Sequence, residues 1–118
     1  MGTHKDLEVW NISMDFVVDI YKLTQNFPEE EKFGLVSQMR RAAVSVPSNI
    51  AEGAGRKSNK ENLHFLYIAL ASLTELDTQL ILSERLGFCS STEEINMLKK
   101  IKSKLINLIK YLKSLEKH

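Results

Sequence analysis

The chain is poor in several residue types on which large classes of protein depend. It has a single cysteine, Cys89, among 118 residues, so an internal disulfide is impossible and the sequence fits a reducing cytoplasm. No apolar run reaches the ~20 residues that a membrane-spanning helix needs, and residues 1–10 lack the apolar core of a signal peptide. The sequence therefore predicts one cytoplasmic domain over residues 1–118, without membrane association.

Signals of catalysis and of metal binding are also scarce. The sequence shows neither a nucleophile elbow nor the spacing of a catalytic triad. Glu61 and His64 have the i, i+3 spacing found in di-metal bundles, but such sites need a second motif of the same kind. The other histidines, His4 and His118, stand near the ends of the chain. We therefore expect no enzymatic activity, no cofactor and no metal site.

The alternation typical of a β-strand is absent too, and apolar residues recur instead at the three- and four-residue spacing of amphipathic helices. Pro28, which precedes three glutamates, is typical of a helix start. Ser58 with Glu61 has the spacing of a capping box, and Ser91 with Glu94 repeats it. These signals predict four helices, at about residues 6–26, 28–54, 59–86 and 92–116.

The connections between these helices are short, which forces neighbouring helices to run antiparallel. The predicted fold class is therefore all-α, an antiparallel up-down-up-down four-helix bundle. Within the second helix, Pro47 removes a backbone hydrogen bond and predicts a bend. The expected core stripe of the first helix is Leu7, Trp10, Met14, Val17 and Tyr21. That of the fourth helix is Leu98, Ile101, Leu105, Leu108, Leu112 and Leu115.

Further apolar residues stand outside the main stripes of the last two helices. Those with the largest side chains are Phe65, Ile68, Ile95, Ile106 and Ile109. A bundle needs one stripe per helix, so the surplus indicates a second buried surface, most simply the interface of a homo-oligomer. A wider core face within one chain explains the same residues equally well.

Charge is distributed unevenly although the formal net charge is only +1. Residues 99–118 contain seven lysines and a single acid, Glu116, whereas acids outnumber lysines in residues 1–31. Such asymmetry marks either an anion-binding surface or a contact between acidic and basic helices. A solvated helix with lysines near its negative end shows the same pattern, so the sequence leaves the role of the lysine-rich segment open.

A second basic set combines Arg40 of the second helix with Arg56, Lys57 and Lys60 around the connection to the third. Along a continuous helix, Arg41 and Arg56 would lie ~22 Å apart, which suits a phosphate backbone that runs along the bundle. Aromatic residues are few near this connection, so base stacking on a single strand is poorly supported. We expect Arg40, Arg56, Lys57 and Lys60 to contact nucleic acid.

A polar set accompanies the apolar stripe of the second helix and is predicted to form a structural network. Its members are Gln38, Arg41, Ser45, Asn49 and Glu52. We expect Asn49 and Glu52 to be partly buried, with Arg41 or Gln38 as a partner within the chain or across an interface. Glu52→Ala would then leave a buried cation unpaired and cost about 3 kcal/mol.

The longest motif of the chain runs through the second helix. It reads Phe27-Pro28-x-x-Glu31-x-Phe33-Gly34-Leu35, Gln38-x-x-Arg41-Ala42 and Ser45-x-Pro47-x-Asn49-Ile50-Ala51-Glu52-Gly53, followed by Arg56. This motif resembles the four-helix-bundle family of the 23S rRNA intervening-sequence protein, also labelled S23. The resemblance implies a homo-oligomer, a ring of five subunits. It also implies kinship with the accessory protein of diversity-generating retroelements, a basic pentameric barrel that associates with nucleic acid.

Together with the basic connection, the resemblance favours a non-enzymatic, homo-oligomeric bundle that binds nucleic acid, most simply structured RNA. The alternative is a protein-interaction scaffold whose polar set docks a partner protein. Titration with RNA fragments and capture of a bound protein separate these two functions.

Overall fold

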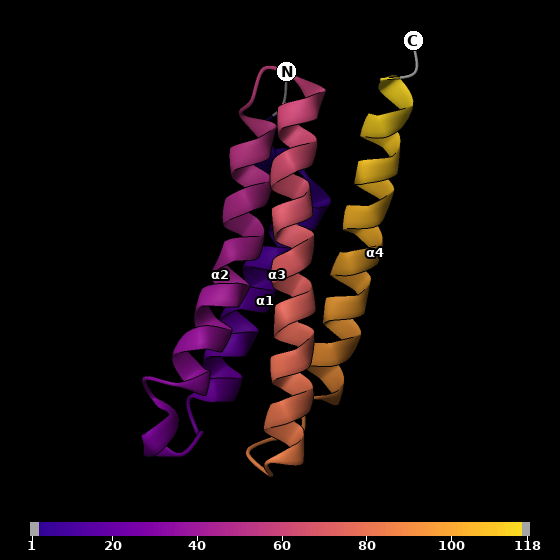
Figure 1. Ribbon diagram of the computed structural model, residues 1–118. Coiled ribbons are helices and arrows are strands. Elements are labelled where there is room, and N and C mark those ends of the chain that lie inside the picture. The colour runs from indigo at the N-terminus through magenta and orange to yellow at the C-terminus, as the bar shows by residue number, and fades with distance from the viewer. Residues whose placement is uncertain (1–2, 117–118) are drawn as a thin grey trace.

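The computed structural model describes residues 3–116, and every regular element in that range is helical (Figure 1). The four long helices are α1 (Glu8–Thr24), α2 (Leu35–Ala54), α3 (Asn59–Arg85) and α4 (Thr92–Leu115). Two short 3₁₀ helices, η1 (His4–Asp6) and η2 (Glu29–Glu31), precede α1 and α2. The predicted all-α fold class is confirmed. Lys117 and His118, which the sequence analysis also considers, lie outside the described residues.

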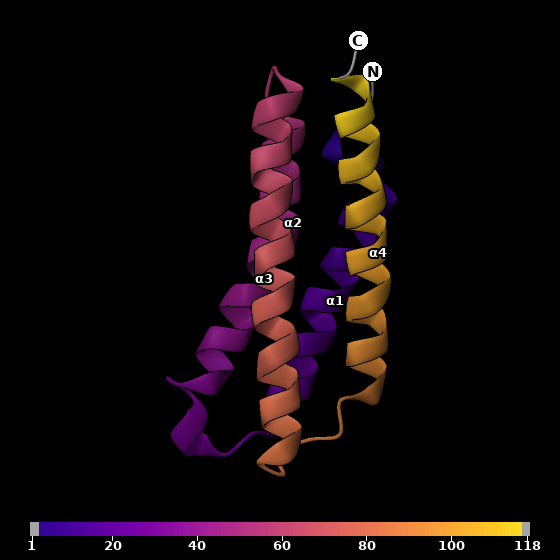
Figure 2. The ribbon, with the colours of Figure 1, turned by 45° about the vertical axis from the view of Figure 1, so that its right-hand side comes forward.

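The helices form an elongated bundle that measures 51 × 19 × 19 Å. Successive helices run antiparallel, and α4 packs back against α1, so the bundle closes in the order α1, α2, α3, α4 (Figures 1 and 2). The α2–α3 connection lies at the end of the bundle where α4 finishes (Figure 1). α2 continues through Pro47 as one helix and changes direction in its middle part (Figure 2).

The start of α2 differs from the sequence prediction. A helix was expected from residue 28, but Pro28 instead precedes the 3₁₀ turn η2, and α2 begins at Leu35. Gly34 separates the two with φ −107° and ψ −110°, a backbone conformation that a continuous helix cannot contain. The other helix boundaries agree with the predicted ones to within two residues.

The two predicted capping boxes have different outcomes. Ser58 caps α3 as expected, because its Oγ accepts a hydrogen bond of 3.2 Å from the backbone N–H of Glu61. Ser91 makes no side-chain cap at α4. Its backbone N–H and its hydroxyl instead donate to Oε1 of Glu84, at 3.0 and 3.4 Å, and this contact fixes the connection between α3 and α4.

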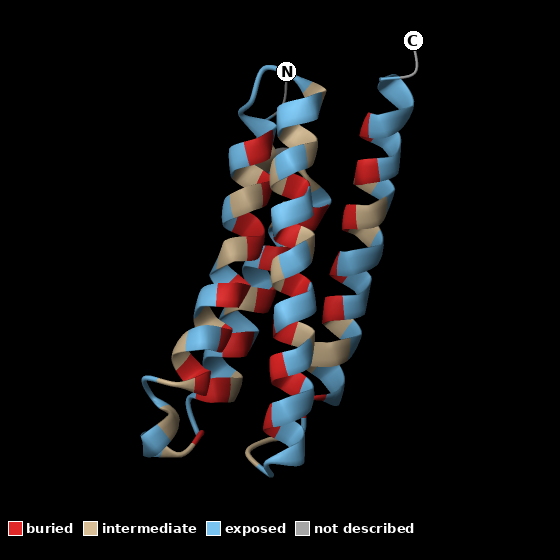
Figure 3. Ribbon diagram, in the orientation of Figure 1, coloured by how far each residue is buried: buried red, intermediate tan, exposed pale blue. Residues whose placement is uncertain are grey.

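Buried residues gather on the sides of the helices that face one another (Figure 3), but the buried face of α1 is not the one that periodicity predicted. Met14 and Tyr21, expected in the core, are each 43% exposed. The residues that are buried instead are Val9, Ser13, Phe16, Ile20 and Thr24. Ser13 and Thr24 are compatible with the core because each hydroxyl donates to a carbonyl of the helix, that of Trp10 or Ile20, at 2.8 Å. Because two residues of the buried row are polar, the apolar pattern of the sequence does not reveal this face.

The buried row of α4 departs from the expected seam at two positions. Ile109 occupies the core in place of Leu108, and Leu115 is exposed. The buried members are Leu98, Ile101, Leu105, Ile109 and Leu112. Ile109 therefore belongs to the core of the single chain and contributes nothing to a second buried surface.

α2 and α3 share the most extensive contact between helices in the bundle. Small residues permit their approach: a Cβ atom added to Gly53 would lie 2.6 Å from Oδ1 of Asn62 and 3.1 Å from Cβ of Phe65. About two helical turns away, the hydroxyls of Ser45 and Ser72 meet at 2.8 Å across the same interface. The absence of a side chain at Gly53 therefore sets the distance between the two helices.

α3 is long and apolar enough, by length and composition alone, to cross a membrane. The core helix of a bundle meets the same criterion, and α3 packs against both α2 and α4. Its buried row extends from Leu66 to Ser83. Of its apolar stretch, 33% is buried inside the bundle, so packing within one chain accounts for part of the apolar character of α3.

Gly53→Ala is expected to lower the free energy of unfolding by about 1–3 kcal/mol, because the new methyl group would force α2 and α3 apart. Chemical denaturation followed by circular dichroism measures this change. Gly55→Ala is the matched control: its Cβ would find its nearest atoms at 3.7 Å, and φ of −86° suits alanine. The control is expected to be neutral or to stabilise by up to about 1 kcal/mol. Equal losses in both variants would contradict the close approach at Gly53.

Candidate nucleic-acid interface

The α2–α3 connection carries three cations at one end of the bundle (Figure 1). Arg56 and Lys57 lie in the turn itself, Lys60 lies in the first turn of α3, and all three are exposed. Beside them is a cavity of about 560 Å³, lined by Arg56, Ser58, Lys60, Glu61, His64 and Phe65. We call this set, together with Lys57, the loop site. Three of the four residues predicted to contact nucleic acid are therefore close together.

Arg56 is oriented by two contacts at the rim of the loop site. Its guanidinium lies 4.8 Å from the ring centroid of Phe65, and Nη2 lies 3.3 Å from Oε1 of Glu52. The ion pair is exposed on both sides, so it contributes little to stability, and a phosphate can replace the carboxylate. His64 meets the edge of the Phe65 ring at 5.2 Å. The cavity thus combines cations with an aromatic surface.

Lys57 and Lys60 differ from Arg56 in having no ion-pair partner. Within residues 3–116, neither ammonium group lies within salt-bridge distance of a carboxylate. Glu61 is the one acid that lines the cavity. The loop site therefore presents two ammonium groups that are not ion-paired with a carboxylate of residues 3–116.

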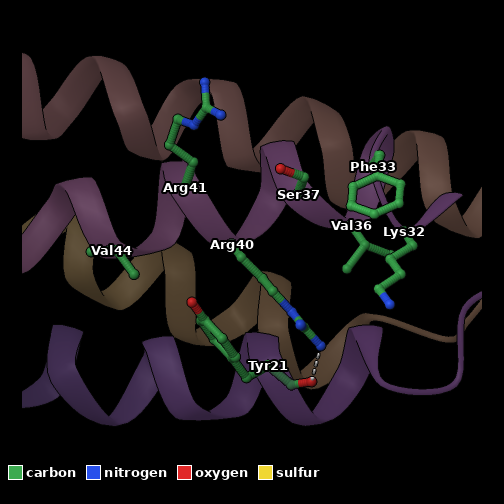
Figure 4. Close-up of a pocket in the computed structure, with 8 residues that line it drawn as sticks. All are labelled: Tyr21, Lys32, Phe33, Val36, Ser37, Arg40, Arg41 and Val44. Atoms are coloured by element: carbon green, nitrogen blue, oxygen red, sulfur yellow. Dashed lines mark hydrogen bonds between the residues drawn. The ribbon is translucent and has the colours of Figure 1, made fainter.

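Arg40, the fourth predicted contact, lies far from the loop site. Arg40 is fourteen residues before Ala54, the last residue of α2, which is roughly 21 Å along the helix axis, and Arg56 lies in the turn beyond. Its Nε donates to Oγ1 of Thr24 at 3.0 Å, and Nη2 donates to the carbonyl oxygen of Tyr21 at 3.3 Å (Figure 4). The guanidinium also lies 4.5 Å from the centroid of the Tyr21 ring. Arg40 therefore holds the last turn of α1 against α2, and the structure does not bring it together with the other three cations.

The surroundings of Arg40 form a groove between α1 and α2. A cavity of about 470 Å³ is lined by Tyr21, Lys32, Phe33, Val36, Ser37, Arg40, Arg41 and Val44 (Figure 4). A second cavity of about 390 Å³ continues it along the helices and shares Val44. Phe33, at the rim, is 89% exposed. We call this feature the α1–α2 groove. The apolar pattern of the sequence predicts Met14 and Tyr21 in the core, so it gives no sign of an apolar groove there.

The predicted structural network is only partly formed. Asn49 is half-buried, and its Nδ2 donates to the carbonyl and hydroxyl oxygens of Ser45, at 2.8 and 2.9 Å. Ser45 in turn meets Ser72, a partner on α3 that the sequence reasoning missed. The signal available in the sequence was the small size of Ser72, which suits a close contact between helices.

Within one chain, the other three members stand outside this network. Gln38, Arg41 and Glu52 are exposed, and Arg41 forms no ion pair with any described residue. Glu52 pairs with Arg56 across one turn of the helix surface rather than with a buried cation. Glu52→Ala is therefore expected to lower the free energy of unfolding by about 0.5 kcal/mol, the contribution of an exposed ion pair, instead of about 3 kcal/mol. The face of α2 that carries these residues points away from the bundle axis, so packing within one chain leaves them exposed.

Cys89 and the acidic residues offer no further site. Within residues 3–116, no three side chains of histidine, cysteine, aspartate or glutamate come close enough to hold a metal ion. Partial burial, together with the charges of Glu84 and Glu94, raises the pKa of the Cys89 thiol above its usual range. The thiol is consequently protonated at neutral pH, which makes it a poor nucleophile.

Known proteins resemble this chain in both sequence and fold. The profile of the 23S rRNA-intervening sequence protein family matches residues 5–113. A solved structure with the same fold is that of a protein of unknown function from the S23 ribosomal protein family of Bacteroides thetaiotaomicron. It shares 29% identity, covers 86% of this chain and 98% of its own, and superposes with a TM-score of 0.78. A comparison with curated proteins found no match. Because the profile spans nearly the whole chain, the protein belongs to the 23S rRNA-intervening sequence protein family.

Proposed function

We propose that this protein is a non-enzymatic, cytoplasmic RNA-binding bundle and that the loop site is its RNA contact. The observation that carries the proposal is the grouping of Arg56, Lys57 and Lys60 around a cavity with an aromatic wall. Phosphate groups dominate the affinity of proteins for nucleic acid, and cations without carboxylate partners are free to bind them.

The geometry of the loop site suits RNA with an exposed turn or loop. The planar guanidinium of Arg56 can contact a phosphate through two donors, while the ring of Phe65 lies beside it. An unpaired base that leaves a stem can enter the cavity, which a base within a duplex cannot do. The family name refers to a sequence that interrupts 23S rRNA, so a hairpin from 23S rRNA is the natural first ligand.

Fluorescence anisotropy with a labelled 23S rRNA hairpin at low salt tests this proposal. The double variant Arg56→Ala with Lys57→Ala is expected to raise Kd roughly tenfold, because two phosphate contacts are lost. The slope of log Kd against log salt concentration should also fall by roughly 1.8, since each duplex phosphate contact contributes about 0.9.

The matched control removes one lysine and one arginine at the opposite end of the bundle, Lys22→Ala with Arg85→Ala. Both residues are exposed and stand in the last turns of α1 and α3. The control should retain the wild-type Kd to within about twofold. Absence of binding by the wild-type protein, or equal losses in the two double variants, would count against the loop site.

We also propose that copies of the chain associate through the face formed by α1 and α2. Five large apolar side chains are exposed there: Met14, Val18, Tyr21, Phe33 and Val44. Arg41 of α2 also lines the groove on this face, so the face carries a cation that can meet an acidic side chain of a second copy. The surface expected from sequence is a weaker candidate, because Ile109 is in the core and Ile95 packs against it.

Light scattering coupled to size exclusion tests the association. The wild-type chain is expected to elute with a mass that is a multiple of 13.5 kDa, fivefold for the ring implied by the family resemblance. Phe33→Ser with Val18→Ser should release monomers, since exposed apolar contacts supply most of the interface energy. Ile81→Ser with Leu82→Ser, on the exposed side of α3, is the control and should leave the mass unchanged. A wild-type monomer at micromolar concentration would contradict the proposal.

A further inference from the structure

The lysines of α4 point to two different sides of the helix. Between residues 99 and 115 the helix has six lysines and no acid. Nζ of Lys104 lies 2.8 Å from Oε1 of Glu8 on α1, and the hydrogen bond and charge of this lysine lower the pKa of the Glu8 carboxyl. Lys113 follows nine residues later, which is about two and a half helical turns, so its side chain leaves the helix on the opposite side from Lys104. It therefore faces α3 rather than α1.

Lys113 meets an aromatic residue on α3. Its Nζ lies 5.5 Å from the ring centroid of Tyr67, and Tyr67 is 43% exposed. Part of the tyrosine ring is thus open to solvent beside a cation. The sequence could not show this pairing, because the two residues are far apart along the chain and meet only through the packing of α3 against α4.

Tyr67 is continuous with the loop site. Lys60, His64 and Tyr67 are spaced at i, i+4 and i+7, so they form one row along the exposed side of α3. Lys60 and His64 line the cavity of the loop site, and Tyr67 lies about 10 Å beyond Lys60 along the helix axis. The C-terminal half of α4 runs alongside the N-terminal half of α3, which contains these three residues (Figure 2).

The charge of this surface has one sign. No acidic residue occurs between positions 62 and 74 of α3 or between positions 99 and 115 of α4. Lys110, one turn before Lys113, is exposed. Between Glu61, which lines the loop site, and Glu116, one turn after Lys113, the two helices therefore offer two lysines and a tyrosine ring with no acid of their own in these stretches.

We propose that single-stranded RNA leaves the loop site along α3 and α4, with a base stacked on Tyr67 and phosphates at Lys110 and Lys113. This inference rests on the proposed RNA binding at the loop site. Aromatic rings flanked by cations are the usual platform for single strands, because every base has a face to stack while the backbone follows the positive charge. The lysine-rich half of α4 is then a binding surface rather than a merely solvated one.

Two RNAs distinguish the extended surface from the loop site. One is the blunt 23S rRNA hairpin, and the other is the same hairpin with a single-stranded extension that contains 2-aminopurine. Wild-type protein is expected to bind the extended RNA about 5- to 150-fold more tightly, the range for one stacked base. Stacking on Tyr67 should also quench the 2-aminopurine fluorescence.

Tyr67→Ala is expected to remove the gain from the extension and the quenching, while the Kd for the blunt hairpin stays within about twofold. Tyr67→Phe, which keeps the ring, should retain both. Tyr111→Ala is the matched control: Tyr111 is also exposed, but it lies seven residues from Lys104 and so on the side of α4 toward α1. Lys110→Gln with Lys113→Gln should reduce the salt slope by about 1.4 for the extended RNA alone.

The outcomes separate the two proposals. If the blunt hairpin does not bind, the loop-site function is wrong and the extension along α4 is wrong with it. If the blunt hairpin binds but the extension adds no affinity, only the further inference is overturned. It is also overturned if Tyr111→Ala has the effect of Tyr67→Ala, or if polyglutamate displaces the extension as effectively as single-stranded RNA, which would mark a surface for acidic peptides.

Discussion

The close approach of α2 to α3 is the constraint on which the rest of the bundle depends. It exists because Gly53 has no side chain, so that Asn62 and Phe65 can occupy the space where a Cβ would lie. The Ser45–Ser72 hydrogen bond keeps the same spacing farther along the interface. Two helices held this closely need only a short turn between them, and that turn is where the unpaired cations of the loop site are located. Packing in the interior thus determines where positive charge gathers at the surface.

Much of the fold was predictable from local rules. The four helices, their antiparallel order and the Ser58 cap follow from periodicity and capping chemistry, which depend on residues close together in sequence. The buried face of α1 was not predictable in this way, because Ser13 and Thr24 satisfy their hydroxyls within the helix and so behave as core residues. Periodicity registers the apolar residues of a helix but cannot decide between two faces when polar residues belong to one of them.

The candidate site shows the same division. Arg56, Lys57 and Lys60 were identified together because they are neighbours in sequence, and the structure keeps them together. The role of Arg40 depends on Tyr21 and Thr24 of another helix, and no local pattern contains that contact. Glu52 shows a related limit. The sequence places it correctly beside the apolar stripe of α2. Whether that position is buried or exposed depends on how α2 is rotated against α3, and in the structure Glu52 is exposed.

The unequal contacts between helices also bear on how the chain folds. The α2–α3 pair is joined by a turn of a few residues and shares the largest interface, whereas α1 and α4 come from opposite ends of the chain and share a smaller one. Contacts between segments close in sequence cost little loop-closure entropy, so the α2–α3 hairpin is the natural nucleus and α1 and α4 join it later. In the native state we expect the amide hydrogens of α2 and α3 to exchange most slowly, because the α1–α4 side of the bundle opens without separating the central pair.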